Sequence, residues 1–473
     1  MLFSSTTFLY LFLPMVLFFD FVVFRKSRFL QNAFLLLASL FFYAWGEPRF
    51  VLVMMLSIVI NWFFGLLVSK RQTHESLAKA ILALTILFNL WVLFRFKYLG
   101  FAARVTSQLS GKTLLIPEIA LPIGISFFTF QAMSYVIDVY RGNGKVQTNL
   151  LYVGLYISFF PQLIAGPIVR YETIADEIQN RKETVDDFFN GFARFVFGLA
   201  KKVLLANDFA VLADIVFNGV KSGQSCSVLF SWLGAVAYTL QIYFDFSGYS
   251  DMAIGLGRMF GFHYPENFNY PYISTSITEF WHRWHISLGS WFRDYIYIPL
   301  GGNRRGKARQ IFNLFIIWFL TGLWHGANFT FVVWGLMYFV LLLLEKLTGL
   351  GKTPASVIAT AGKRIYTLFF VVMGWVIFRC ETIGDAVAFL KSLFGLNDNT
   401  VLDGVFIGWF KQNLILILIG VVLSTPLFRI LGEKAKNNQY FGWVKPVILA
   451  ALFVLSVASL VSNTYNPFIY YNF

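Results

Sequence analysis

Long apolar runs recur along the whole chain and are separated by short polar or basic stretches. A helix that crosses a bilayer needs about 20 mostly apolar residues, and fewer where neighbouring helices shield it. We therefore expect roughly ten to twelve membrane-spanning helices. The runs cover residues 8–24, 29–45, 50–68, 80–94, 150–164, 228–246, 329–344, 365–378, 414–427 and 447–461.

The composition supports a membrane protein. Hydrophobic residues make up 58% of the chain and charged residues only 13%, against about 25% charged residues in soluble domains. The net charge of +14 lies largely in short loops between apolar runs, which is the distribution that the positive-inside rule describes. We therefore attribute the positive charge to cytoplasmic loops that set the orientation of the helices in the membrane, and we expect no nucleic-acid partner.

The polar residues are concentrated in the middle of the sequence. We find no long linker and no internal repeat, so we expect one membrane domain over residues 1–473. Residues 1–110 are predicted to form peripheral helices and residues 336–473 to form C-terminal helices. Residues 120–335 carry most of the Gly, Asp, His and Arg residues that stand among aromatic ones. This segment is the predicted catalytic core.

Two stretches in this core, LPIGISFFTF from Leu121 and PQLIAGP from Pro161, place Pro and Gly inside apolar sequence. Irregular backbone at membrane depth persists only when it is buried in protein or lines a cavity, so broken or re-entrant helices are one interpretation. Ordinary kinks, with close helix packing at Gly124 and Gly166, are the alternative.

Acidic side chains stand at the end of a further apolar run, in YFDFSGYSDMAIGLG. An acid in or near a membrane is costly and is by default functional or paired. Asp245 and Asp251 are therefore candidates for shaping a site, by orienting a histidine or pairing with an arginine. A purely structural ion pair is the alternative.

A third stretch, residues 276–300, predicts an amphipathic helix. Ser276 and Glu279 have the spacing of a capping box, which marks a helix start. Such a helix would lie at the membrane interface or line a vestibule, although an aromatic belt has the same composition. One face carries Trp284, Leu288, Trp291 and Tyr295, with Trp281, His285 and Phe292 beside it, and the other carries Arg283, Ser287, Ser290 and Asp294.

His325 is the most informative of the five histidines. It ends an apolar run that begins near Arg309, and 16 residues of helix would carry its ring roughly 24 Å into the bilayer. A satisfied core histidine is the plain alternative. The neighbours Trp324 and Asn328, in the sequence WHGAN, leave a functional site, which they would help to shape, open beside that alternative.

Two chemistries could use these histidines. His282 and His285 are three residues apart, but the sequence shows no HExxH pattern and no third ligand nearby, so we expect no metal site. Acyl transfer fits better, because a neutral imidazole can remove the proton of an attacking hydroxyl group. No GxSxG motif indicates a serine acyl-enzyme.

At WHRWHISLGSWFRDYIYIPLGGNRRG (281–306) and GLWHGANFTFVVWG (322–335) the chain resembles the membrane-bound O-acyltransferase family. The resemblance is greatest to the bacterial branch that contains the alginate O-acetylation membrane subunit and the peptidoglycan O-acetylation membrane proteins. It extends over essentially the whole chain, through LPIGISFFTF, IDVYRG, LIAGP, YFDFSGYSDMAIGLG, ENFNYPYIS, GWVIFR and NPFIYYNF.

The resemblance implies that His325 and His285 are catalytic, whereas Arg283 is a candidate for shaping the site. His282 stands where relatives often carry Arg or Asn, so no function is carried onto it. The implied fold is all-α and polytopic: a ring of transmembrane helices, with re-entrant and amphipathic interfacial helices, around a central tunnel.

The implied activity is acetyl transfer in a bacterial cytoplasmic membrane. No bound cofactor is expected, and the donor substrate is acetyl-CoA or another acyl thioester, free or on a carrier protein. The acceptor is an exported polysaccharide or an extracytoplasmic partner transferase, and membrane lipid surrounds the chain. D-alanyl transfer to teichoic acid is the second candidate. A polysaccharide or lipid-linked sugar transporter is the alternative from another class.

Overall fold

The computed structural model describes residues 1–112, 119–164, 166–435, 441–463 and 465–469. Regular structure in these residues is helical, and they contain no strand beyond one isolated antiparallel bridge between Phe268 and Trp284. The prediction of an all-α fold is therefore confirmed.

Seven helices of the described chain are long and apolar enough to cross a membrane, which confirms a multi-pass membrane protein. Two shorter apolar helices, Phe8–Val23 and Arg28–Ala44, precede them. The total of ten to twelve spans stays a prediction. The seven are Val51–Gln72, Glu75–Ser110, Val185–Lys221, Phe329–Thr348, Val357–Arg379, Gly404–Leu423 and Val444–Ser462.

The chain forms two compact units. The first contains Met1–Val196 and Tyr249–Pro265, and the second contains Phe197–Gly248 and Glu266–Asn472. Helices α10 and α12 contribute residues to both units. The single domain with its three predicted parts stays a prediction.

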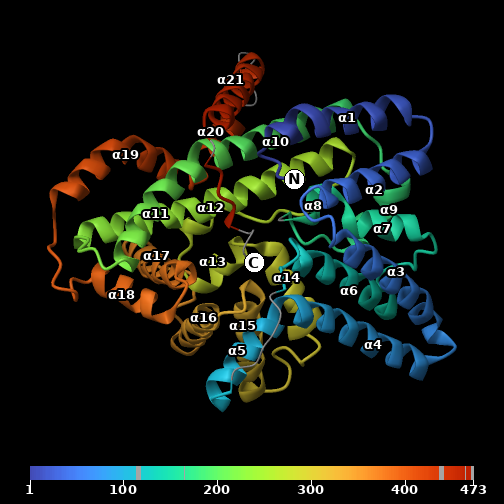
Figure 1. Ribbon diagram of the computed structural model, residues 1–473, viewed down its shortest axis with the longest axis horizontal. Coiled ribbons are helices and arrows are strands. Elements are labelled where there is room, and N and C mark those ends of the chain that lie inside the picture. Colours follow the sequence, from blue (N-terminus) through green and yellow to red (C-terminus); the bar gives the residue numbers. More distant parts are fainter. Residues whose placement is uncertain (113–118, 165, 436–440, 464, 470–473) are drawn as a thin grey trace. The chain divides into compact units, whose positions relative to one another are not determined.

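In the first unit, α3 packs against α4, α6 and α7, while α2 packs against α7 (Figure 1). Three π-helical turns extend α1 and α4. The helices are α1 (Leu13–Phe18), α2 (Arg28–Ala44), α3 (Val51–Val68), α4 (Glu75–Leu93), α5 (Leu99–Ser110), α6 (Ile125–Arg141), α7 (Leu150–Ser158), α8 (Phe160–Leu163), α9 (Tyr171–Asn180) and α10 (Val185–Ala200).

The Pro- and Gly-containing stretches are broken helices that also pack closely. The apolar run 150–164 is divided at Phe159, whose ψ of 118° ends α7, and Pro161 occupies the first turn of α8. Gly124 has a φ of 72° at the start of α6, and a Cβ there would lie 2.7 Å from the Leu163 carbonyl oxygen. Only glycine permits both this conformation and this approach.

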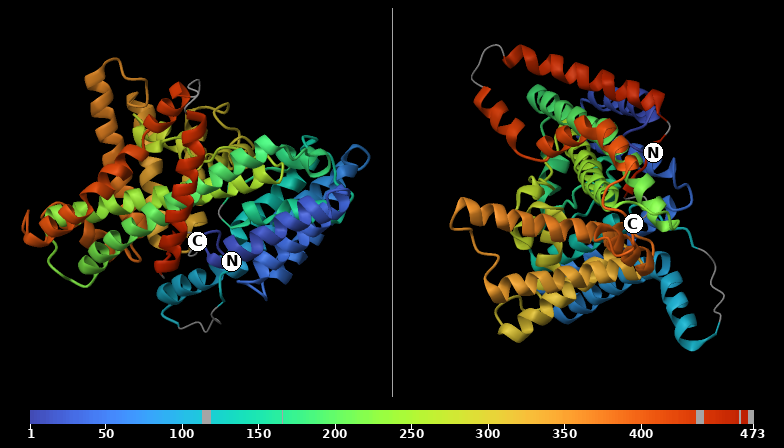
Figure 2. Two further views of the ribbon diagram at one scale, coloured as in Figure 1. Left: turned by 90° about the horizontal axis from the view of Figure 1, so that it is seen from above. Right: turned by 90° about the vertical axis from the view of Figure 1, so that its left-hand side faces the viewer.

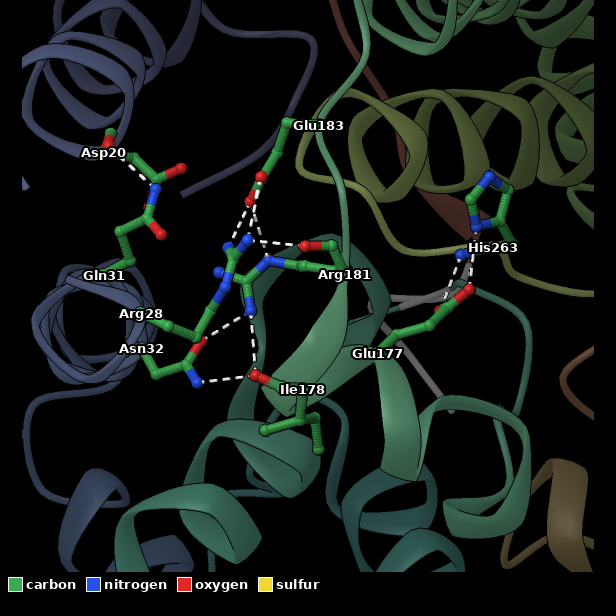
Figure 3. A network of polar contacts seen from close by, with 9 residues as sticks. All are labelled: Asp20, Arg28, Gln31, Asn32, Glu177, Ile178, Arg181, Glu183 and His263. Atoms are coloured by element: carbon green, nitrogen blue, oxygen red, sulfur yellow. Dashed lines mark hydrogen bonds and ion pairs between the residues drawn. The ribbon is translucent and has the colours of Figure 1, made fainter. Parts of the chain in front are cut away.

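A polar network ties α2 to the segment that follows α9 (Figure 3). Arg28 forms an ion pair with Glu183, with Nη2 3.0 Å from Oε2. The buried Arg181 donates to Asn32 Oδ1 at 2.6 Å, and Asn32 donates to the Ile178 carbonyl at 2.7 Å. These partners offset part of the cost of burying the charges of this network, although Arg181 Nη2 is buried without a hydrogen-bond partner among the described residues.

In the second unit, α15, α16 and α17 pack in sequence, and α18 packs against α11 and α17 (Figures 1 and 2). The helices are α11 (Asn207–Lys221), α12 (Val228–Met259), α13 (Ile277–Arg283), α14 (Ile286–Phe292), α15 (Lys307–His325), α16 (Phe329–Thr348), α17 (Val357–Arg379), α18 (Ile383–Leu393), α19 (Gly404–Leu423), α20 (Leu427–Ala435) and α21 (Phe441–Ser462).

Two glycines let α15 and α16 approach each other closely. A Cβ on Gly322 would overlap the Phe331 carbonyl oxygen, and a Cβ on Gly335 would overlap the Trp318 carbonyl oxygen. Small residues at such crossings permit the backbone contact that holds membrane helices together. This contact fixes how the end of α15 lies against the start of α16.

We predict that Gly322→Ala lowers the free energy of unfolding by about 1–3 kcal/mol, because the added methyl group forces the two backbones apart. Gly408→Ala is the matched control, since nothing lies within 4 Å of a Cβ at this position in α19. Thermal unfolding in detergent compares the two variants. Equal stability of Gly322→Ala and the wild type would contradict the close crossing.

Candidate functional site

A tight turn between α15 and α16 positions His325. The sequence prediction that the run before His325 is helical is confirmed, and His325 is the last residue of α15. Asn328 caps α16 by accepting from the Thr330 backbone N–H at 3.2 Å, and its amide donates to the Glu381 carbonyl at 2.6 Å. His325 itself is buried, and the hydrogen bonds of Asn328 fix the end of the turn that follows it.

The helix predicted to start at Ser276 does start there. The Ser276 hydroxyl accepts from the Glu279 backbone N–H at 3.0 Å. The buried carboxylate of Glu345 accepts from the backbone N–H groups of Ile277 and Thr278, at 2.5 and 2.9 Å. A carboxylate at a helix N-terminus stabilises the helix dipole, so α16 anchors α13.

The prediction of one continuous amphipathic helix over 276–300 is wrong. The first helix ends at Arg283, and His285 adopts φ 45° and ψ 53° before α14 begins. The cause is the segment 267–269, which takes over the backbone hydrogen bonds. Asn269 N–H donates to the Arg283 carbonyl at 2.9 Å, and Ile286 N–H donates to the Asn267 carbonyl at 3.0 Å.

The break changes which side chains face inward. Trp284, Leu288, Trp291 and Tyr295 are all buried, in agreement with the predicted apolar face. Ser287, which was predicted on the polar face, is buried as well. Beyond α14 the backbone forms a π-helical turn, Arg293–Tyr297, and π-helical turns frequently accompany functional sites.

A cavity of about 600 Å³ joins the two motif histidines. Both His285 and His325 line it, although 40 residues separate them in the sequence. Along α15 the lining extends from Leu314 to His325, which is 325 − 314 = 11 residues, or roughly 16 Å of helix. Other lining residues are Trp281, His282, Ser290, Arg293 and Thr321.

Aromatic rings surround the two imidazoles. The Trp324 ring contacts both, with its centroid 5.8 Å from that of His285 and 4.9 Å from that of His325. His325 also contacts Trp334 and Phe378 edge to face, at 5.0 and 5.1 Å. Rings packed in this way hold the imidazoles in fixed orientations in a site of low polarity.

The electrostatics of His285 follow from its burial. It is 2% exposed, and it lies between two short helices outside the seven apolar ones. Burial lowers the pKa of the His285 imidazole to about 3, because a charged ring would be poorly solvated there. The ring is therefore neutral at physiological pH, and its Nδ1 lies 3.1 Å from Asn267 Oδ1.

The two acidic candidates form ion pairs. Asp245 Oδ1 lies 2.7 Å from Lys202 Nζ, with both side chains almost fully buried, and its Oδ2 accepts from the Ile469 N–H at 2.9 Å. Asp251 belongs to the first unit, where it pairs with Arg194 at 2.9 Å. Neither carboxylate is among the residues that line the cavity.

The remaining candidate residues lie at different positions around the cavity and at the ends of helices. Trp324 contacts both histidines, and Asn328 is a helix cap. Arg283 pairs with Glu279 at 2.9 Å and donates to the Asn269 carbonyl at 3.0 Å, so it holds the broken helix end. His282 is exposed at the cavity wall.

Sequence reasoning missed Asn267 and Lys202. Asn267 stands between aromatic residues in ENFNYPYIS, one of the stretches that carry the resemblance, and that position was the available signal. Lys202 follows an apolar run directly, and an ionisable residue in such sequence calls for a partner. Among the described residues, no three His, Cys, Asp or Glu side chains come together as metal ligands.

Comparison with known proteins places the chain among acyl-transferring membrane proteins. The model of the membrane-bound O-acyltransferase family matches residues 80–382, which include both histidines. A probable alginate O-acetylase of Pseudomonas putida is 39% identical over 494 residues, and the alignment covers 100% of both chains.

Two further relatives extend the comparison. The peptidoglycan O-acetyltransferase of Helicobacter pylori is 30% identical over 524 residues, covering 100% of this chain and 98% of the relative. The teichoic acid D-alanyltransferase of Bacillus subtilis is 30% identical over 271 residues, covering 54% and 68%. Its match is shorter than those of the two acetyl-transferring relatives.

The multi-pass helical fold, the two histidine motifs around one cavity and the match over residues 80–382 agree with one another. The chain belongs to the membrane-bound O-acyltransferase family and is an O-acyltransferase.

Proposed function

We propose that this chain transfers an acetyl group from a cytoplasmic thioester to a hydroxyl group of an exported polysaccharide, or to an extracytoplasmic partner transferase, in a bacterial cytoplasmic membrane. The observation that carries the proposal is that His285 and His325 line the same cavity. The full-length similarity to proteins named for alginate and peptidoglycan O-acetylation supports acetyl as the group transferred.

His325 is the proposed general base. It removes the proton of the acceptor hydroxyl group as the oxygen attacks the thioester carbonyl, and the protonated ring then returns the proton to the leaving thiolate. The carbon–sulfur bond breaks as the new carbon–oxygen ester bond forms. A neutral imidazole is suited to both steps, because its ordinary pKa lies near the working pH.

The cavity dimensions support a thioester donor. A lining that follows roughly 16 Å of α15 towards His325 accommodates an extended acyl-bearing arm, and His285 on the opposing segment helps to position it. Acetyl-CoA and an acyl carrier protein both present such an arm. The exposed Arg293 at the cavity wall forms an ion pair with Asp294, with Nε 2.7 Å from Oδ1, so it could bind the phosphate that both donors carry only by sharing or exchanging this partner.

The five other candidates are proposed to shape the site indirectly. Trp324 orients both imidazoles, Asn328 fixes the turn after His325, and Arg283 fixes the end of α13. The ion pairs of Asp245 and Asp251 hold their own helices in place.

D-alanyl transfer is the second candidate function, since the Bacillus subtilis relative matches over 54% of the chain.

The test is transfer in proteoliposomes supplied with a labelled acetyl thioester or a labelled D-alanyl thioester, together with a polysaccharide acceptor. We expect an alkali-labile acetyl ester on the polysaccharide, or on an added partner transferase, and at most slow D-alanyl transfer. Faster D-alanyl transfer would favour the second candidate. Movement of glycan across the membrane without acylation would favour the transporter alternative instead.

A further inference from the structure

The backbone at His285 is held by one residue, through both its main chain and its side chain. A positive φ costs a residue with a Cβ about 1–2 kcal/mol, so the conformation at His285 requires support from its surroundings. Asn267 gives this support. Its carbonyl oxygen accepts from the Ile286 N–H, and its side-chain Oδ1 accepts from the Ser287 N–H at 3.2 Å and the Ser287 hydroxyl at 2.8 Å.

The same contacts decide which atom of Asn267 faces His285. The Ser287 backbone N–H can only donate, so the atom it meets must be the amide oxygen and not the amide nitrogen. That oxygen lies 3.1 Å from His285 Nδ1. Because an amide oxygen can only accept, Nδ1 must carry the proton, and in a neutral ring the lone pair is then on Nε2.

The Nε2 atom of His285 is buried and has no hydrogen-bond partner among the described residues. His285 lines the 600 Å³ cavity, but Nε2 itself has almost no exposed surface, so a ligand in the cavity reaches this atom only when a neighbouring side chain moves. A buried ring nitrogen without a partner is costly to maintain in a folded protein. Such atoms in native structures require an explanation.

We infer that Asn267 is a positioning residue that holds His285 in the tautomer with its lone pair on Nε2, the form in which the ring accepts a hydrogen bond from a substrate N–H or O–H group that enters the cavity. The inference rests on the proposed function for its substrate. Two sources offer this chemistry, namely the amide N–H groups of a thioester arm and the hydroxyl group of the acceptor.

The inferred tautomer also excludes a role. A ring whose Nε2 carries no proton cannot donate a hydrogen bond to the oxyanion that develops on the thioester carbonyl. His285 therefore accepts a hydrogen bond from the substrate, and other groups must stabilise the oxyanion. His325 has a different role, because it takes up and returns a proton during the reaction.

The first measurement is ¹⁵N NMR of protein labelled only at histidine, which is feasible because the chain has five histidines. His285→Gln identifies the signals of His285 by their loss. We expect the wild type to show a protonated Nδ1 and an unprotonated Nε2 at His285. A protonated Nε2 would overturn the inference, whatever the enzyme's activity.

The second measurement uses three variants. Asn267→Leu removes the accepting oxygen, and we expect kcat/KM to fall about 10- to 100-fold, by analogy with the loss of the hydrogen-bond partner of a metal-bound histidine. Asn267→Asp keeps an accepting oxygen and should stay within several-fold of wild type. Asn303→Leu, at an exposed position outside the cavity lining, is the matched control and should behave as wild type.

The kinetic pattern identifies the bonded group. A rise in KM for the thioester alone assigns the bond to the donor arm, and a rise in KM for the acceptor alone assigns it to the hydroxyl group. Equal losses in Asn267→Asp and Asn267→Leu, with His285 still in the wild-type tautomer, would overturn the positioning role. Wild-type protein that shows the tautomer but transfers no acyl group would refute the proposed function while leaving the tautomer intact.

Discussion

Replacing His325 with Gln is expected to reduce acyl transfer by about 10²- to 10⁴-fold, the usual contribution of a positioned general base. Gln has a similar size and can hydrogen bond, but it cannot take up a proton at neutral pH. His325 is 3% exposed and lies against Trp334 and Phe378, so a smaller replacement such as Ala would also leave a hole. The Gln variant separates loss of the base from loss of packing.

The measurement is the initial rate of labelled acetyl transfer in detergent with both substrates saturating. His74→Gln is the matched control, because His74 is exposed at the start of α4. It should retain the wild-type rate. Wild-type turnover by folded His325→Gln would show that His325 is not the base, and thermal unfolding establishes that the variant is folded.

Replacing Lys202 with Met is expected to lower the free energy of unfolding by about 3–5 kcal/mol, the usual result of removing one partner of a buried ion pair. Lys202 Nζ lies 2.7 Å from Asp245 Oδ1, and the side chains are 1% and 2% exposed. The variant leaves the Asp245 carboxylate buried without its positive partner. The methionine side chain keeps most of the volume, so the loss is mainly electrostatic.

Lys221→Met is the matched control for this prediction. Lys221 pairs with Glu381 at 2.6 Å, but the two side chains are 46% and 75% exposed. Such an exposed pair contributes about 0–1 kcal/mol. Thermal unfolding in one detergent compares the variants. If Lys202→Met were as stable as Lys221→Met, the buried pair would not support the second unit.

The all-α membrane fold could be predicted from the sequence, because a helix that crosses a membrane requires a long apolar segment that is visible in the sequence. Runs of apolar residues must be helical in lipid, where every backbone N–H and C=O group needs an internal partner. The start of α13 at Ser276 and the end of α15 at His325 were also predictable, since each depends on residues that are neighbours in the sequence.

The break at His285 could not be predicted in this way. A pattern with helical spacing continues through Trp284 and Leu288, and local propensity favours an unbroken helix. The opposing interaction comes from Asn267, which is 18 residues from His285 in the sequence. Its hydrogen bonds to residues 286 and 287 replace the hydrogen bonds that a continuous helix would make there. The spacing of apolar residues cannot predict a hydrogen-bond partner so distant in the sequence.

Only the resemblance indicated that His285 and His325 act in one site. The sequence shows that each histidine follows a tryptophan, but 40 residues separate the two, and nothing in the residues alone brings them together. The structure brings them to one cavity because Glu345 of α16 anchors the start of α13 while α16 packs against α15. Both contacts depend on tertiary packing, which local periodicity does not encode.

The central claim is that one buried imidazole serves a donor from one face of the membrane and an acceptor from the other. The direct test uses sealed proteoliposomes with uniformly oriented protein, with membrane-impermeant labelled acetyl-CoA or acetylated carrier protein on one side and the polysaccharide, with any partner transferase, on the other. We predict acetyl ester on the acceptor side with wild-type protein and none above background with His325→Gln. Equal labelling with both proteins, or acetyl ester formed only when donor and acceptor share one side, would contradict the account.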